Sequence, residues 1–454
     1  MTNRAISSID GRYAGQTVEL RDYFSEWALM KYRVNIEVEW LIAQSEGAWA
    51  DPVRNLTGEE KTILRGLVTG FDDTSLAKIK EIEKITNHDV KAVENYLREV
   101  LGETSMADLI EFIHFGCTSE DINNLAYALM LRDGITGVWL PEAEGLLELV
   151  TQAAETYRDI PFMARTHGQA ASPTTVGKEL AVFVYRWRRQ LKAVKNLEYL
   201  GKFNGAVGNY NAHLVAYPDA PWEDISADFI ETLGLTWNPL TTQIESHDYM
   251  AECFHALNRF NNILLDFDRD MWLYISYGYF KQLVVSGEVG SSTMPHKVNP
   301  INFENSEANI GMSNAILSHL ADKLQVSRLQ RDLSDSSALR NVGSGIAHSC
   351  IAISNAVKGF KRVDVNREVI DAELADSWEL LSEAVQTVMR KNGYSEPYET
   401  LKAFTRGKDI SEEMLRDFIK GLEIPEADKS RLLALTPAAY TGLASKLVER
   451  LKQT

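Results

Sequence analysis

The segment 290–300 has the residue types of a reactive loop. It reads Gly-Ser-Ser-Thr-Met-Pro-His-Lys-Val-Asn-Pro, and its two prolines favour neither a helix nor a strand. The adjacent hydroxyls of Ser291 and Ser292 precede the basic pair His296 and Lys297. We interpret the segment as a lid that carries a reactive serine. The alternative interpretation is an exposed connecting turn.

Four other segments interrupt the helical pattern with clustered polar residues. They are Asp10–Tyr13, Thr86–Asp89, Thr118–Asp121 and Arg165–Gln169. Each alone has an ordinary alternative, because a Thr-Ser-Glu-Asp run is typical of a helix N-cap and a histidine in a loop, such as His88, is often a surface group. Five such breaks in one chain favour a shared site over separate accidents.

The composition limits the classes of partner. The 454 residues are enough for two to four domains with a large core. The 47 basic and 64 acidic residues give a net charge of −17, and no block of basic residues stands out, which argues against a nucleic-acid partner. An anionic substrate would therefore need a local cationic pocket.

The cysteines and the hydropathy indicate a reducing compartment. Cys117, Cys253 and Cys350 are odd in number and far apart, which fits neither a disulfide framework nor a zinc ribbon. The segment 1–13 is polar, and no stretch is long and apolar enough to cross a bilayer. We expect a cytoplasmic protein with reduced thiols and no membrane partner. With no Gly-rich phosphate loop and no clustered metal ligands, the sequence predicts no cofactor and no metal.

The middle of the chain has the pattern of long helices. The stretch Tyr249–Tyr277 lacks Pro and Gly, and its apolar residues recur at steps of three and four: Phe254, Leu257, Phe260, Leu264, Phe267, Met271 and Tyr274. Similar helices are expected over Thr175–Leu200 and Phe303–Leu324. Such helices bury their apolar stripes against equally long neighbours. The sequence predicts an all-α fold with a helical bundle and, as a hypothesis, a homo-oligomer.

Shorter helices are predicted on both sides of this bundle. They cover Asp22–Ala48, Leu76–Leu101, Arg367–Asn392, Ser411–Lys420 and Glu426–Leu435. Strand-like alternation is scarce, and the irregular stretches Ala206–Tyr217 and Leu235–Ile244 are the expected place for a short hairpin. We predict three helical regions, which are an N-terminal domain at 1–120, a central long-helix bundle with the loop at 121–364, and a C-terminal domain at 365–454.

The loop 290–300 resembles the signature of the fumarase/aspartase superfamily, whose members eliminate fumarate from succinyl-type substrates. Four further features resemble the longer bacterial form of the branch that cleaves adenylosuccinate. They are His296 within Met-Pro-His-Lys, the run Asn-His-Asp-Val-Lys at 87–91, and the segments Thr118–Asp121 and Arg165–Gln169. The resemblance spans nearly the whole chain, from Asp10 through the run 331–336 and into the C-terminal region.

The resemblance implies a fold, an assembly and two reactions. Members form a homotetramer around a central bundle of long helices, and each active site is assembled from three subunits. The small-molecule substrates would be adenylosuccinate, cleaved to AMP, and SAICAR, cleaved to AICAR, each with release of fumarate. Two alternatives stay open: another lyase or cycloisomerase of the superfamily, and a catalytically silent homologue that keeps the fold.

The resemblance also assigns catalytic roles. A β-elimination needs a base for the Cβ proton, an acid for the leaving nitrogen and cations for the carboxylates. Ser291 would be the base and His167 the acid, with Glu304 paired to His167, while Lys297 and Asn299 would hold the succinyl carboxylates. A serine serves as a base only where a closed loop excludes water. For Glu304 the alternative is a solvated acid in the first turn of a helix.

The nucleotide is expected to contact Arg12, Tyr13, Arg331, Ser336 and Arg340, since arginine suits forked recognition of phosphate. For Arg331 and Arg340 the alternative is ordinary ion pairing with neighbouring acids. The other pocket residues that the resemblance implies are Asn87, His88, Asp89, Thr118, Ser119, Gln169, Gln243, Ser292, Val298, Asn305, Ser337, Ala338 and Leu339. Of these, His88 would also support the catalytic pair.

Overall fold

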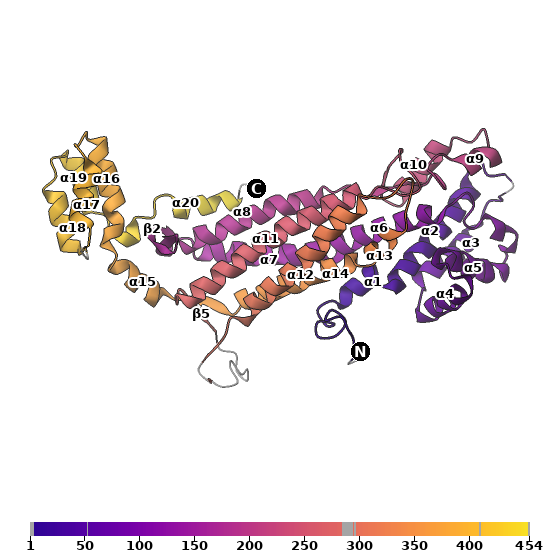
Figure 1. The fold of residues 1–454 in the computed structure, drawn as a ribbon, viewed down its shortest axis with the longest axis horizontal. Helices are drawn as coiled ribbons and strands as arrows, with labels where there is room; N and C mark the ends of the chain where they lie inside the picture. The colour runs from indigo at the N-terminus through magenta and orange to yellow at the C-terminus, as the bar shows by residue number, and fades with distance from the viewer. Residues whose placement is uncertain (1–3, 52, 284–293, 295–296, 408–409, 453–454) are drawn as a thin grey trace. The chain divides into compact units, whose positions relative to one another are not determined.

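The computed structural model describes residues 4–51, 53–283, 294, 297–407 and 410–452 (Figure 1). The fold is all-α, as predicted, and the strands of the described residues form three two-stranded sheets. The chain divides into two compact units. One unit comprises Met1–Ala143, Gln190–Asn262 and Ala308–Ser354, and the other comprises Glu144–Arg189, Ile263–Glu307 and Asn355–Thr454. We call them the first and the second unit.

The first unit begins with short helices around an apolar core. They are η1 (Val18–Leu20), α1 (Arg21–Phe24), α2 (Glu26–Glu46), α3 (Gly58–Thr69), α4 (Asp73–Thr86), α5 (Asp89–Gly102) and η2 (Ala107–Phe112). Met30, Val34 and Leu41 of α2 pack in this core with Leu64 and Val93. The stretch predicted as one helix over Asp22–Ala48 breaks at Ser25, whose hydroxyl accepts a hydrogen bond from Ala28 N and caps α2.

The rest of the first unit forms loops and helices around α6. These elements are α6 (Ser119–Gly134), the π-helical turn η3 (Ile135–Trp139), β3 (Leu200–Gly201), α9 (Asn211–Ala216), α10 (Trp222–Thr232), β4 (Thr236–Trp237) and α13 (Ser334–Leu339). The prediction of a short hairpin within 206–217 and 235–244 is wrong. The strands β3 and β4 pair in parallel, and α9 occupies part of the first stretch. Helix α9 forms there because His213 is buried and packs edge-on against Trp222.

Five long helices contribute residues to both units. They are α7 (Leu140–Thr156), α8 (Val176–Lys195), α11 (Asp248–Ser276), α12 (Ile301–Leu324) and α14 (Val342–Phe360). In the first unit, Asn261 of α11 donates to Ser313 of α12 at 3.0 Å and accepts from Ser349 of α14 at 2.7 Å. In the second unit, the Phe267 ring of α11 lies within 6.4 Å of the Phe303 ring of α12. These contacts confirm the predicted helical bundle.

The second unit adds a hairpin and a C-terminal helical cluster to its part of the bundle. The strands are β1 (Pro161–Thr166) paired antiparallel with β2 (Gln169–Thr175), and β5 (Phe280–Gln282) paired antiparallel with β6 (Val363–Val365). The remaining helices are α15 (Arg367–Ala375), η4 (Trp378–Leu381), α16 (Ser382–Lys391), α17 (Pro397–Thr405), α18 (Glu412–Lys420), α19 (Glu426–Leu433), η5 (Pro437–Ala439), α20 (Ala444–Val448) and η6 (Glu449–Lys452). Leu381, Val385, Leu401 and Leu415 belong to their common core.

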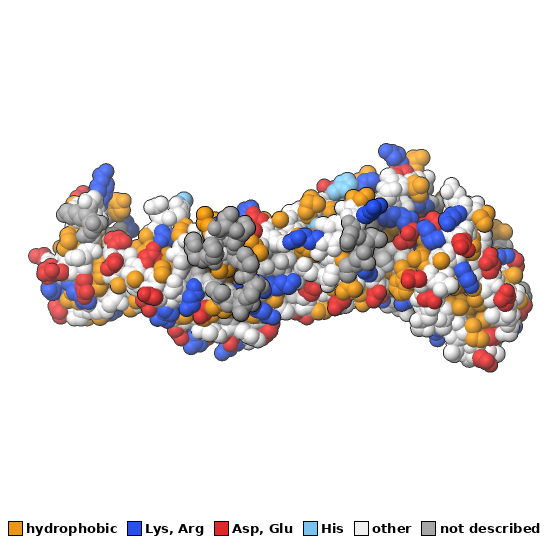
Figure 2. Space-filling view, turned by 90° about the horizontal axis from the view of Figure 1, so that it is seen from below, with side chains coloured by type: hydrophobic (Ala, Val, Ile, Leu, Met, Phe, Trp, Pro, Cys, Tyr) orange, Lys and Arg blue, Asp and Glu red, His pale blue; other side chains and the backbone are white. Residues whose placement is uncertain are grey.

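The surface is polar but keeps apolar residues on the bundle helices. Acidic and basic side chains are interspersed over the face drawn in Figure 2. Large apolar side chains are nevertheless exposed on α8, α11 and α12: Val182, Tyr185, Trp272, Leu273, Ile301 and Met312. Among the described helices, none has the length and apolar character required to span a membrane.

Candidate active site

The expected site residues fall into two groups that belong to different units. The first unit holds Arg12, Tyr13, Asn87, His88, Asp89, Thr118, Ser119, Gln243, Arg331, Ser336, Ser337, Ala338, Leu339 and Arg340. The second holds His167, Gln169, Lys297, Val298, Asn299, Glu304 and Asn305. Ser291, Ser292 and His296 lie outside the described residues.

Asp89, the first residue of α5, forms ion pairs with two arginines. Its Oδ2 lies 2.9 Å from Nη2 of Arg33 and 3.2 Å from Nη2 of Arg340. Burial alone would raise the pKa of Asp89, but the charge and the hydrogen bond of Arg33 outweigh burial and lower the pKa. Asn87 ends α4 in the left-handed conformation, with φ of 50°, and His88 caps α5 by accepting from Lys91 N. This turn exposes Asn87 and His88 to solvent, next to the ion pairs that Asp89 forms with the two arginines.

Arg331, the other arginine expected to bind the nucleotide, contacts Glu120 and Gln243. Nη2 of Arg331 lies 2.8 Å from Oε1 of Glu120, and its Nη1 donates to Oε1 of Gln243 at 3.2 Å. Gln243 in turn donates to the carbonyl of Ala206 at 2.9 Å. Glu120 is only 3% exposed, and burial raises its pKa even though the charge of Arg331 opposes the shift. Arg331 thus pairs with Glu120, while Arg340 pairs with Asp89 and also lies 3.9 Å from Glu26.

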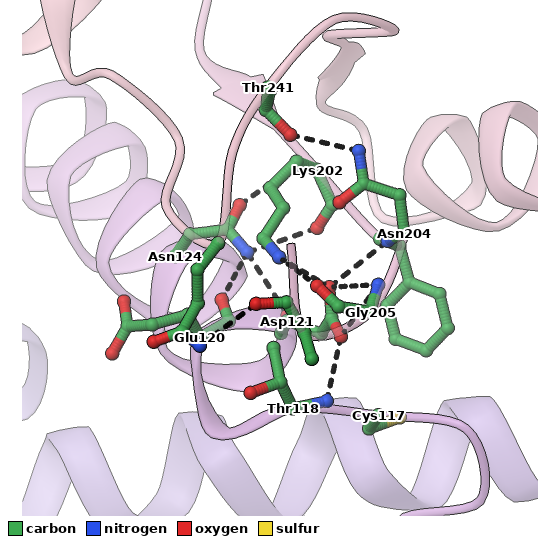
Figure 3. Close-up of polar contacts among 12 residues, drawn as sticks. Cys117, Thr118, Glu120, Asp121, Asn124, Lys202, Asn204, Gly205 and Thr241 are labelled. Carbon is green, nitrogen blue, oxygen red and sulfur yellow. Dashed lines mark hydrogen bonds and ion pairs between the residues drawn. The ribbon is translucent and has the colours of Figure 1, made fainter. Parts of the chain in front are cut away.

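A buried ion pair fixes the loop before α6. Asp121 and Lys202 have fully buried side chains, and Lys202 Nζ lies 2.9 Å from Asp121 Oδ1. Figure 3 shows further donors around the Asp121 carboxylate: the backbone N–H groups of Thr118 at 2.8 Å, Asn204 at 3.0 Å and Gly205 at 3.2 Å. The pair therefore ties the start of α6, with Thr118 and Ser119, to the segment 202–205.

His167 lies in the two-residue turn of the β1–β2 hairpin. His167 and Gly168 both have positive φ, 54° and 74°, as a tight hairpin turn requires, and His167 is exposed. Two residues earlier, Arg165 Nη2 lies 2.5 Å from Oε1 of Glu373 on α15 and its guanidinium lies over the ring of Tyr277. These contacts anchor β1 close to the turn and leave the imidazole exposed at the tip of the hairpin.

The end of the loop and the start of α12 carry the other residues of this group. Lys297 is exposed, and the carbonyl of Val298 accepts from Gln282 Nε2 at 2.5 Å. Glu304 is exposed in the first turn of α12, where its Oε1 accepts from the indole Nε1 of Trp272 at 3.1 Å. Asn299 and Asn305 are half-buried. The expected pairing of Glu304 with His167 stays a prediction.

A cavity of about 360 Å³ adjoins the Asp10–Tyr13 segment in the first unit. Its lining combines two arginines, two carboxylates and hydroxyls, including Arg21, Arg340, Asp10, Glu26 and Ser344. Arg340 also lines a second cavity of about 220 Å³ whose walls are mostly apolar. The two arginines and the two carboxylates balance in charge, so the lining offers guanidinium groups to a ligand without a net positive charge.

Within the described residues, no three His, Cys, Asp or Glu side chains are grouped as ligands of a metal ion. The three cysteines are free, and burial raises the pKa of each thiol. Cys117 lies next to Thr118 and is half-buried, but a thiol with a raised pKa is a poor nucleophile.

Sequence reasoning missed Arg33 and Lys202, two charged residues that organise the site. It included Glu120 and Asp121 only as members of the Thr118–Asp121 segment and gave them no role. All four side chains are at most 3% exposed. A usable signal exists for Arg33, because it lies in α2 beside the buried Met30 and Val34, where a lone charge requires a partner. Their partners lie far away in sequence, so the pairing itself is visible only in the fold.

The chain is similar to characterised families along nearly its full length. Residues 11–316 match a family model described as lyase, and residues 327–441 match one described as adenylosuccinate lyase C-terminal. The adenylosuccinate lyase of Vibrio cholerae is 52% identical, covering 98% of each chain. The enzyme of the same name from Escherichia coli is 51% identical, covering 99% of this chain and 98% of its own.

Solved structures share the fold at lower identity. A fumarate lyase from a Mesorhizobium species superposes with a TM-score of 0.76 at 20% identity, covering 96% of this chain and 97% of its own. A 3-carboxy-cis,cis-muconate lactonizing enzyme from Pseudomonas putida gives a TM-score of 0.72 at 21% identity, covering 95% and 96%. These two likenesses bear on the fold alone.

Proposed function

The chain belongs to the adenylosuccinate lyase family, and from this premise we propose that it cleaves adenylosuccinate to AMP and SAICAR to AICAR, releasing fumarate each time. The observation that carries the proposal is identity of about half over nearly the full length of both chains. It is a C–N lyase, and purine nucleotide synthesis is the metabolism in which both reactions belong. We place it in the cytoplasm as part of the same proposal.

We propose that Ser291 is the base and His167 the acid. The base takes the proton from Cβ of the succinyl group, the electron pair forms the C=C bond of fumarate, and the C–N bond breaks as the nitrogen receives a proton from His167. The tip of a tight hairpin suits an acid, because it exposes the imidazole while Arg165 anchors the strand behind it. Lys297 and Asn299 would neutralise the succinyl carboxylates, and Glu304 would pair with His167.

The nucleotide would bind to the group in the first unit. Arg331 and Arg340 are each held by a carboxylate, so their guanidinium groups are oriented before a ligand arrives. Arg12 and Tyr13 would close the phosphate end beside the cavity that Arg340 lines. Asn87, His88, Thr118, Ser119 and Gln243 would complete this side of the pocket, with Gln169 and Asn305 on the succinyl side.

We propose a homotetramer whose sites combine residues of different subunits. Apolar side chains exposed on α8, α11 and α12, such as Tyr185, Trp272 and Met312, support burial of the bundle against other copies. A mixture of two inactive variants tests shared sites. Hybrids of His167→Ala and Arg340→Met subunits should regain activity, because some sites then receive neither substitution. Hybrids that form but stay inactive would contradict delivery of these two residues by different subunits.

The direct test is an ultraviolet assay of purified protein with adenylosuccinate. We expect the absorbance change of AMP formation and one fumarate per AMP. The alternative is another lyase or cycloisomerase of the superfamily, which the shared fold of the muconate lactonizing enzyme keeps in view. Fumarate release from argininosuccinate or malate, with adenylosuccinate left intact, would overturn the proposal.

A further inference from the structure

We propose that Arg33, Asn123 and Glu120 form one positioning network that sets the two nucleotide arginines, Arg331 and Arg340, in a fixed spacing. This inference rests on the proposed function, because it assigns the arginines to the nucleotide. None of the three residues has a proton-transfer role in the proposed reaction. All five lie in the first unit, so every contact of the network is internal to one compact body.

The network starts at the Asp89 carboxylate. Arg340 reaches Asp89 Oδ2 at 3.2 Å, and Arg33 reaches the same oxygen at 2.9 Å. Arg33 is only 2% exposed, whereas the side chain of Arg340 is 43% exposed. The buried arginine therefore has no solvent to satisfy it and holds the carboxylate, while the exposed arginine remains available to a ligand.

The network continues from Arg33 to the second arginine through an amide. Arg33 Nε donates to Asn123 Oδ1 at 2.9 Å, and Asn123 Nδ2 donates to Glu120 Oε1 at 2.8 Å. The same Glu120 oxygen lies 2.8 Å from Arg331 Nη2. The amide thus turns its carbonyl to a cation and its N–H to a carboxylate, which is the favourable orientation at both ends.

The two arginines flank the short helix α13. Arg331 precedes it, Arg340 follows it directly, and the expected pocket residues 336–339 lie inside it. Residues of α2, α5 and α6 therefore hold the arginines at both ends of this segment. Two guanidinium groups that bind the same nucleotide must lie at a fixed distance from each other. Buried, hydrogen-bonded charges hold such a distance better than flexible ion pairs at the surface do.

The variants Glu120→Gln and Arg33→Met test the network. Glu120→Gln keeps the shape and removes the charge that holds Arg331. We expect the KM for adenylosuccinate and the Kd for AMP to rise about tenfold in each variant, while kcat changes less than about threefold. The double variant should lose less than the product of the two single losses, because both residues act through one network.

Glu60→Gln is the matched control. Glu60 is a buried carboxylate of the same unit that pairs with Arg54 at 2.9 Å, outside the network. This variant should cost stability and leave KM and the Kd for AMP unchanged. The conservative variant Arg33→Lys should recover only part of the AMP affinity lost in Arg33→Met, since an ammonium lacks the fork that reaches both Asp89 and Asn123.

The possible outcomes are distinct. If Arg33→Met does not fold, Glu120→Gln decides alone, since it is nearly isosteric. Unchanged KM and unchanged AMP affinity in Glu120→Gln would overturn the network, as would a fall in kcat with KM unchanged. Fully multiplicative losses in the double variant would likewise overturn it. A wild-type protein that does not cleave adenylosuccinate would instead overturn the proposed function.

Discussion

The indole Nε1 of Trp272 donates a hydrogen bond to Oε1 of Glu304 at 3.1 Å, so α11 orients a carboxylate at the start of α12. If Glu304 works with His167, Trp272→Phe should lower kcat about two- to tenfold with little change in KM, because the exposed Glu304 loses one hydrogen bond worth about 0.5–1.5 kcal/mol. Steady-state kinetics check this. Trp378→Phe, the same change in the C-terminal cluster, is the control, and equal losses in both variants would refute the role of Glu304.

Loss of the proposed acid or base should nearly abolish turnover. His167→Ala and Ser291→Ala should each lower kcat about 10²- to 10⁴-fold, the usual range for a missing acid or base. The mass in solution should match that of the wild-type protein, since His167 is exposed at a hairpin tip. Near-normal turnover in either variant would remove the role assigned to that residue.

The buried pair of Asp121 and Lys202 makes a prediction about stability. Lys202→Met leaves a carboxylate in a fully buried position without its cation, which should lower the free energy of unfolding by about 3–5 kcal/mol. Urea denaturation measures it. Lys61→Met breaks the more exposed pair with Glu46 and should cost less than about 1 kcal/mol. Equal costs would show that the backbone donors alone satisfy Asp121.

The aromatic centre of the bundle in the second unit rests on Phe267. It is 1% exposed, and its ring lies within 5.5 Å of the Phe183, Trp187 and Phe360 rings. Phe267→Ala should cost about 3–5 kcal/mol, the combined loss of burial and a new cavity. Phe404→Ala is the control because Phe404 is half-buried beside Phe418, and its cost in denaturant unfolding should be smaller.

His247 should make the protein sensitive to acid. Burial lowers its pKa from 6.5 to about 4, so the folded state keeps it neutral. The unfolded chain binds the proton first, and stability is therefore lost as the pH falls from 6.5 towards 4, by on the order of 3 kcal/mol. His247→Asn, which tolerates the φ of 63°, should weaken this dependence in unfolding measurements between pH 7 and about pH 4. Burial raises the pKa of Glu245, so this residue contributes the opposite pH dependence of stability in the wild-type protein and in the variant alike. Parallel pH curves would contradict the assignment.

The long helices were predictable because their signal is local and repeated. The periodic stretch Tyr249–Tyr277 becomes α11, displaced by one residue at each end. The β1–β2 hairpin was missed because its strands contain Pro and many small residues, although the His-Gly pair between them has the composition of a tight turn. A search for residue pairs that favour positive φ would have found it.

The charged residues that organise the site show the limit of sequence patterns. The motif around Thr118 could be found because its polar residue types are clustered. Arg331 could be found because the resemblance to the family assigns it to the nucleotide. The contact of Glu120 with Arg331 joins positions that lie about two hundred residues apart in the sequence, and only packing brings them to 2.8 Å. The three-domain division of the sequence stays a prediction.

The burial of Cys253 and Cys350 and the half-buried position of Cys117 give this protein a low background reactivity towards thiol-directed reporters. Because burial keeps each sulfur protonated, maleimide probes should react slowly with the unmodified chain. A single cysteine introduced at an exposed position, such as Leu240 or Leu329, would then carry almost all of the label. Fluorescence from such a label would report ligand-dependent rearrangement without removal of any native cysteine.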